Sequence, residues 1–237
     1  MKTKRFFIPV VSLLIGFLLF NACKKDINPI YPVAKPVVTT IPVGIYPAGL
    51  GSTPGTPVCN PFILPENIEV IGEIKSAAFK STVFDKETQN INDFIYTPKT
   101  TFVELGSGSL VQIYMKFYNK NSQPTTLVIP GGLMFLPGDT AAQTGTTTQN
   151  DTIIIPPHDS LGCHIKTYCT NLHKHVPNNT SYKMLGTTVH SDLWTMVNIL
   201  KTKKKLAPGS QVQSIIWNIT DRGGLTDADR TYLNNLP

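Results

Sequence analysis

The chain has 237 residues and a formal net charge of +6, and this length suits one ordinary domain or two small ones with a sizeable core. Three of its 21 cationic residues, Lys2, Lys4 and Arg5, precede an apolar N-terminal stretch. The rest of the chain therefore contains 18 cationic and 15 acidic residues. Such a small excess does not indicate nucleic-acid binding. The low charged content of 15%, together with many Thr, Pro and Gly residues, favours an all-β extracellular protein over a cytoplasmic enzyme.

The N-terminus has the features of a secretory signal. Its positive residues are followed by the apolar residues 6–20, a stretch too short to span a membrane comfortably and without a second apolar run after it. Phe20, Asn21, Ala22 and Cys23 then resemble a lipobox, in which a small residue precedes a cysteine that receives diacylglycerol. We therefore predict a lipoprotein signal peptide over residues 1–22 and lipidation of Cys23.

Two residues of this motif leave alternatives open. Phe20 and Asn21 depart from the usual leucine and small residue, so cleavage by an ordinary signal peptidase and retention as an uncleaved anchor remain possible outcomes. The charged residues 24–26 resemble the tract that sends some lipoproteins to the outer leaflet of the outer membrane, although they also fit the start of a soluble linker. The expected location is the cell envelope, on the outer membrane surface rather than in the periplasm, with the lipid as the membrane contact.

The rest of the chain divides by composition into three parts. Residues 23–60 are rich in Pro, Val, Thr and Gly, a composition typical of extended spacers that build no core. Residues 61–170 contain short apolar runs between turn residues, which predict strands at 110–118, 126–129, 133–135, 152–155 and 162–169, with a polar loop over 139–151. This spacing predicts an antiparallel β-sandwich or a partly open barrel.

After residue 170 the apolar period becomes helical. Ser191 is placed to cap a helix with Leu193, Met196, Val197 and Leu200 on one face. Ser210 is placed to cap a second helix, and Thr226 begins a short third one. Residues 171–237 are therefore expected to form a small helical lobe of the same domain, which makes the fold mainly β with an α+β character overall.

If Cys23 carries lipid, three of the four cysteines, Cys59, Cys163 and Cys169, remain in the domain. Cys163 and Cys169 share one face of the predicted strand at 162–169, but six residues of strand separate them by roughly 20 Å, too far for a disulfide. Cys59 and Cys163 are the candidate disulfide, which would leave Cys169 unpaired in an oxidising compartment.

Two short motifs around Cys169 and Gln213 resemble a known family. Residues 168–171 (Tyr-Cys-Thr-Asn) and residues 212–217 (Val-Gln-Ser-Ile-Ile-Trp) are similar to the paired motifs of the thioester domains of bacterial surface adhesins. The glutamine motif fits fully, whereas Thr170 stands where that family has a larger apolar residue. The similarity extends over about residues 110–220, with about ten specific positions, and the order of strand cysteine and helix glutamine also agrees.

The resemblance implies an internal thioester. Cys169 would attack the side-chain carboxamide of Gln213 and expel ammonia, Trp217 would shield the bond from water, and an incoming amine such as a protein lysine would be acylated. Since the thioester is consumed once, it is a reagent and implies no turnover enzyme. The expected function is adhesion by a surface lipoprotein to an extracellular protein or glycan; a noncovalent binding module of the same fold and a structural envelope component are the alternatives.

Simpler roles exist for the same residues. Ser210 and Gln213 fit a capping box, in which the glutamine reaches back to the first residue of its helix, and Gln211 is a second but poorer thioester candidate. Cys169 also fits a buried free thiol or a partner of Cys59, and Trp194 and Trp217 fit ordinary core positions.

The histidines near Cys169 do not have a metal or protease pattern. His164, His173, His175 and His190 lack partnering cysteine or carboxylate spacing, and no known nucleophile signature surrounds Cys169. The lysines at 201 and 203–205 are typical of a solvated helix end, with attraction to anionic surfaces as the alternative. We expect no metal, no cofactor and no nucleic-acid partner.

Overall fold

The computed structural model describes residues 47–77, 102–206 and 211–237, all of which belong to one unit of the chain. The predicted signal peptide, Cys23 and Ser210 lie outside the described residues. The part of the chain described here is therefore the predicted domain together with the end of the predicted spacer.

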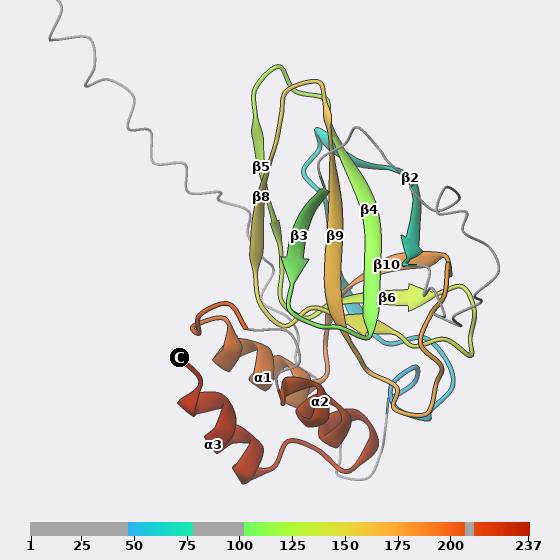
Figure 1. The fold of residues 1–237 in the computed structure, drawn as a ribbon, viewed down its shortest axis with the longest axis vertical. Helices are drawn as coiled ribbons and strands as arrows, with labels where there is room; N and C mark the ends of the chain where they lie inside the picture. Colours follow the sequence, from blue (N-terminus) through green and yellow to red (C-terminus); the bar gives the residue numbers. More distant parts are fainter. Residues whose placement is uncertain (1–46, 78–101, 207–210) are drawn as a thin grey trace, which may run out of the picture. The chain divides into compact units, whose positions relative to one another are not determined.

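Strands make up a larger share of the described chain than helices do (Figure 1). In chain order the strands are β1 (Cys59–Pro61), β2 (Ile68–Ser76), β3 (Phe102–Gly106), β4 (Val111–Asn119), β5 (Thr125–Ile129), β6 (Leu133–Pro137), β7 (Gly145–Thr146), β8 (Asp151–Ile155), β9 (Ser160–Cys169) and β10 (Tyr182–Thr188). Eight of them form one sheet in the order β1-β10-β6-β7-β9-β4-β2, with β3 also beside β9, and β5 pairs with β8. In Figure 1, β6 and β10 run across the direction of β4 and β9.

Strand β4 shows why these sequences form strands. Its residues alternate between buried and partly exposed, with Val111, Ile113, Met115 and Phe117 facing the core. Such alternation is the pattern of a strand with one face on a core and the other toward solvent. The apolar face of β4 packs with residues of β5, β6, β8 and β9 in one hydrophobic cluster, which is the core between the sheet layers.

Strand β9 is the longest strand of the described residues, with seven of its ten residues buried, and it changes neighbours along its length. It pairs antiparallel with β4 on one edge, over residues 160–167, and parallel with β3 on the other, over residues 162–166. Its last two residues, Tyr168 and Cys169, pair instead with Thr146 and Gly145 of β7. Cys169 is therefore the final residue of the strand that joins the two parts of the sheet.

Three short helices follow the strands: α1 (Ser191–Leu200), α2 (Val212–Asp221) and α3 (Asp227–Asn235). Their apolar faces build a second hydrophobic cluster with Leu50, Met134 and Tyr168 from outside the helices. Helix α3 begins with a capping box between Thr226 and Asp229. None of the helices in the described part of the chain is long and apolar enough to cross a membrane.

The structure confirms the predicted antiparallel β architecture with a helical lobe, and it corrects several details. Helix α1 is capped by the His190 side chain, not by Ser191, and β7 lies inside the stretch predicted to be a loop. The predicted helical lobe also contains a strand, β10, which forms because its residues pair with those of β6.

The end of the predicted spacer is also part of the domain. Strand β1 pairs with β10 through Cys59, and Leu50 is buried in the helical cluster with 2% of its surface exposed. These contacts hold residues 47–60 on the domain, although the segment has a spacer-like composition. The spacer boundary predicted at residue 60 therefore lies too far along the chain.

Candidate functional site at Cys169 and Gln213

Cys169 lies where the two hydrophobic clusters meet. Side chains alternate across β9, so that Cys169 faces the core between the sheet layers while Tyr168 faces the helical cluster. The Cys169 side chain is fully buried. The strand continuity predicted from the sequence is confirmed, since Cys163 and Cys169 both face the same cluster.

Helix α2 brings Gln213 and Trp217 to this strand end. The helix is amphipathic, and its buried residues Val212, Ile215 and Ile216 fix its rotation against the helical cluster. Gln213 and Trp217 are four residues apart and therefore share one side of the helix. Both are half-buried, and Trp217 packs on the same cluster as Cys169.

The Gln213 carboxamide is bound at both ends to the backbone of Cys169. The Cys169 N–H donates to Gln213 Oε1 at 2.9 Å, and Gln213 Nε2 donates to the Cys169 carbonyl oxygen at 2.8 Å. Two hydrogen bonds to one residue fix the plane of the carboxamide as well as its position. The Cys169 backbone and the Gln213 side chain, 44 residues apart in the chain, are thus in direct contact.

The capping box predicted for Gln213 involves Ser210, which lies outside the described residues. In the described part of the chain, α2 begins after Gln211, whose side chain makes no capping hydrogen bond. Gln211 is exposed, and the two hydrogen bonds to the Cys169 backbone come from Gln213. Between these two glutamines, Gln213 is therefore the one that contacts the cysteine.

The Cys169 sulfur has polar neighbours despite its burial. Its thiol donates to the Asn171 carbonyl oxygen at 3.2 Å, and the Asn171 N–H points at the sulfur, also at 3.2 Å. The indole N–H of Trp217 is buried without a hydrogen bond of regular geometry, yet it lies close enough to the sulfur to lower the thiol pKa. A developing thiolate would find two N–H donors beside it.

Burial has the largest effect on the acidity of this thiol. It raises the pKa of Cys169 to about 11, although the Asn171 N–H and the Trp217 indole act in the opposite direction. The negative charge of Asp221 raises the pKa further, and Lys174 lowers it. At neutral pH the thiol is protonated in nearly all molecules, so that its nucleophilic form is rare.

The Gln213 carbonyl is polarised by its hydrogen bond. The N–H at 2.9 Å from Gln213 Oε1 withdraws electron density from the carbonyl carbon and is placed to stabilise negative charge on this oxygen. The fold therefore places a polarised carboxamide against the backbone of the residue that carries the buried thiol.

The predicted disulfide between Cys59 and Cys163 is wrong. Both are free thiols, with pKa values raised to about 12 by burial. Cys59 pairs with Thr188 at the β1 edge of the sheet and packs on the helical cluster, whereas Cys163 lies opposite Met115 in the other core. The odd cysteine number therefore does not single out Cys169; its contact with Gln213 does.

Three of the four histidines near Cys169 in the sequence have structural partners. His190 Nδ1 accepts from the N–H groups of Asp192 and Leu193 and so caps α1, while His164 stacks on Tyr114 with ring centroids 4.4 Å apart. The exposed His175 pairs with Asp139. In residues 47–77, 102–206 and 211–237, no three His, Cys, Asp or Glu side chains gather as metal ligands would.

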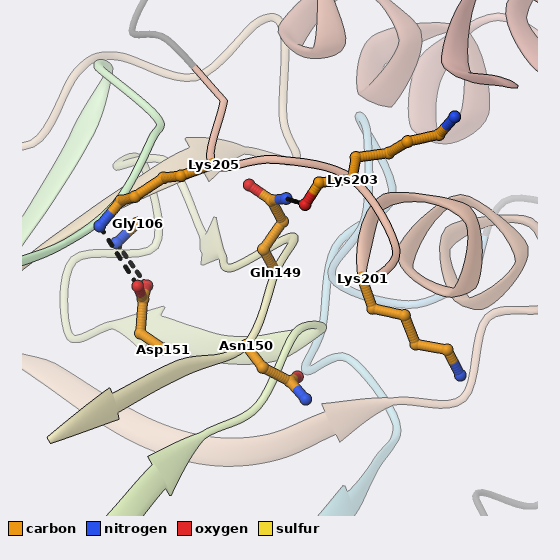
Figure 2. Close-up of a pocket in the computed structure, with 7 residues that line it drawn as sticks. All are labelled: Gly106, Gln149, Asn150, Asp151, Lys201, Lys203 and Lys205. Atoms are coloured by element: carbon orange, nitrogen blue, oxygen red, sulfur yellow. Dashed lines mark hydrogen bonds and ion pairs between the residues drawn. The ribbon is translucent and has the colours of Figure 1, made fainter. Parts of the chain in front are cut away.

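A cavity of about 120 Å³ lies beside the lysine-rich loop after α1 (Figure 2). Figure 2 shows Lys205 reaching toward Asp151, while Lys201 and Lys203 extend away from it. The Gln149 carboxamide donates to the carbonyl oxygens of Leu200, Lys203 and Lys204 and accepts from the Leu206 N–H. These contacts hold the loop in place, and the lysine side chains do not converge on one point.

Two features of the site have no clear sequence signal. Asp221, at the end of α2, has one buried carboxylate oxygen without a hydrogen-bond partner, and its other oxygen accepts from Thr220 and Leu172. Residues 47–53 lie directly against Thr170 and Asn171. A Pro- and Gly-rich segment 120 residues before a cysteine gives no hint of this contact.

Comparison of the chain with models of protein families, with curated proteins and with solved structures gives no match.

Proposed function

We propose that this chain is a lipid-anchored surface adhesin whose Cys169 and Gln213 form an internal thioester for covalent capture of amines. The observation that carries the proposal is the pair of hydrogen bonds that holds the Gln213 carboxamide against the Cys169 backbone, at 2.9 and 2.8 Å. The motif resemblance and the β-sandwich with a following helical lobe support it. The expected lipid at Cys23 rests on the sequence motif alone.

The proposed maturation step is an exchange of nitrogen for sulfur at one carbonyl carbon. The Cys169 sulfur bonds to the Gln213 side-chain carbon, the carbon–nitrogen bond breaks, and the leaving nitrogen departs as ammonia with the thiol proton. The Cys169 N–H stabilises the oxyanion that forms in between. No redox partner, metal or cofactor is needed for this balance.

The proposed capture step regenerates the thiol that maturation consumes. A primary amine attacks the thioester carbon, forms an amide with the former Gln213 side chain, and leaves Cys169 as a thiol again. Burial of the sulfur and the adjacent Trp217 ring keep water from the bond, which extends the lifetime of the reagent. A lysine on a surface protein has the required chemistry, and the amide formed is permanent.

A labelling experiment tests capture. The chain from residue 24 to 237, prepared without the signal and Cys23, is incubated with a fluorescent primary amine and separated under denaturing, reducing conditions. The expected result is one label per chain that survives reduction, located on Gln213 by peptide mapping.

Two pairs of variants sharpen the result. Cys169→Ala and Gln213→Ala each abolish labelling, whereas the controls Cys163→Ala and Gln211→Ala retain it, because neither control residue takes part in the contact between Cys169 and Gln213. Label on the Cys169→Ala variant, or none on the unaltered chain, would overturn covalent capture. The noncovalent binding module would then remain as the explanation of this fold.

A further inference from the structure

The segment Pro47–Thr53, here named the strap, is a compact turn that precedes β1. Its backbone is closed by hydrogen bonds from Gly49 to Thr53 at 3.1 Å and from Leu50 to Pro47 at 3.2 Å. Leu50 projects into the helical cluster and is 2% exposed. Removal of this leucine side chain from water stabilises the docking of the strap on the domain.

The strap is bound to the residues that directly follow Cys169. Gly51 N–H donates to the Thr170 carbonyl oxygen at 2.8 Å, and Asn171 Nδ2 donates to the carbonyl oxygens of Gly49 at 3.1 Å and Gly51 at 2.8 Å. The Asn171 Oδ1 atom accepts from the Thr144 N–H at 2.9 Å. The fully buried Asn171 side chain thus joins the strap to the sheet, with both ends of its carboxamide in use.

The backbone of the same Asn171 holds the sulfur. Its N–H points at Cys169 Sγ and its carbonyl oxygen accepts from the thiol, each at 3.2 Å. A change in the position of Asn171 therefore moves the two groups that orient the nucleophile. The strap reaches the sulfur through one residue.

The strap also touches the end of the helix that carries Gln213. Gly51 has a φ of +56°, and a Cβ at this position would lie 2.1 Å from the Thr220 carbonyl oxygen and 3.2 Å from Asp221 Oδ1. Thr220 and Asp221 are the last turn of α2. The strap therefore lies against both segments of the centre, the turn after Cys169 and the helix of Gln213.

We propose that the strap, acting through Asn171, is a positioning element of the thioester centre, which holds the Cys169 sulfur in place and keeps solvent reagents from it. The inference rests on the proposed function for its biological meaning, since a reagent of long lifetime needs such protection. Its physical content, control of access to the Cys169 thiol, holds with or without a thioester.

The test measures alkylation of each thiol by iodoacetamide in a Gln213→Ala background, in which no thioester forms. Peptide mapping reports Cys169 and Cys163 separately in the 24–237 chain. Leu50→Ala removes the anchor of the strap, and we expect the alkylation rate of Cys169 to rise at least about tenfold while that of Cys163 is unchanged. Asn171→Asp replaces the Nδ2 group that donates both hydrogen bonds to the strap, and we expect it to have the same selective effect.

Matched controls separate this result from general loosening. Leu225→Ala removes a buried leucine from the same helical cluster, at a residue whose N–H donates to Asp192 of α1, and it should change the two rates equally or not at all. The milder Leu50→Val serves if Leu50→Ala fails to fold. Equal acceleration at Cys163 and Cys169, or no acceleration in either Leu50 variant, would overturn the role of the strap. If the thioester itself does not form, the chain that retains Gln213 is not labelled by the amine, and this result is separate from the alkylation rates.

Discussion

At the scale of single residues, the centre combines an unreactive thiol with a well-placed carboxamide. Burial raises the pKa of Cys169 to about 11, so that the thiolate forms rarely at neutral pH, yet Gln213 is fixed beside it by two hydrogen bonds. A slow reaction is sufficient for a bond that is made once per molecule. Groups that stabilise the thiolate then set the rate of maturation.

Trp217 is the first such group to test. Trp217→Phe keeps an aromatic ring over the site but removes the buried indole N–H that faces the sulfur. We expect thioester formation after refolding, followed by mass spectrometry, to slow by about tenfold, which corresponds to about 1.4 kcal/mol of lost stabilisation of the developing thiolate. Trp194→Phe, a half-buried tryptophan of α1, is the control and should leave the rate unchanged. Equal rates in both variants would exclude a role for the N–H group.

His190 gives a pH dependence of known sign. Burial lowers the pKa of His190, so that the folded chain holds it neutral, as its role as acceptor for the Asp192 and Leu193 N–H groups requires. The unfolded chain takes up the proton near pH 6.5. Stability is therefore full above about pH 6.5 and is lost as the pH falls through the lowered pKa of the folded state.

Urea unfolding at pH 7.5 and 5.5 measures this loss. His190→Asn keeps an N-cap acceptor without a titrating group, and the free energy of unfolding should fall less between the two pH values in this variant. His164 contributes a loss of the same sign, because burial, and then the charge of Lys166, lower its pKa too. An identical fall in the original chain and in His190→Asn would contradict the assignment.

At the scale of elements, close approach of the strap to α2 depends on glycine at position 51. Gly51→Ala places a Cβ 2.1 Å from the Thr220 carbonyl oxygen at a positive φ, and we expect a loss of more than about 3 kcal/mol in the free energy of unfolding. Gly72→Ala is the matched control, because Gly72 also has a positive φ but nothing within 4 Å of its Cβ position. It should cost about 1 kcal/mol. Equal losses would show that backbone strain alone matters.

The predictable elements are those whose apolar residues recur with a regular period. Residues Val111 to Phe117 show a strand period in the sequence and in their burial, and the apolar faces of α1 and α2 show a helical one. Strand β9 alternates in sequence but is buried on both faces, because the sheet core lies on one side of it and the helical cluster on the other. The parallel pairing of β3 with β9 and the pairing of β10 with β6 join distant segments, and no local pattern specifies such partners. The same is true of the strap, whose buried Leu50 stands among proline and glycine.

For the candidate site, the sequence identified the cysteine and the glutamine through a motif and misjudged the other cysteines. Counting thiols predicted a disulfide between Cys59 and Cys163, but pairing needs proximity of Cα atoms, which sheet order denies to these two residues. Asn171 was visible as part of the motif. The four hydrogen bonds of its side chain, to Thr144, Thr170 and two carbonyl oxygens of the strap, are apparent only in the folded structure.

At the scale of the whole molecule, the centre exists only when the helical lobe is docked on the sheet. Cys169 comes from β9 in one hydrophobic cluster, and Gln213 comes from α2, whose buried face belongs to the other. The strap, which precedes both in the chain, closes the same corner. The three segments are brought together by the complete fold, so an unfolded or partly folded chain cannot form the bond.

The intact mass of the folded 24–237 chain tests the central claim most directly. With the thioester formed, the chain is lighter than its sequence mass by one ammonia molecule, and methylamine raises the mass by one methylamine while it releases one additional thiol. Gln213→Ala and Cys169→Ala show only the masses of their substitutions. An unaltered chain that has its full sequence mass, and does not change with methylamine, would contradict the thioester between Cys169 and Gln213.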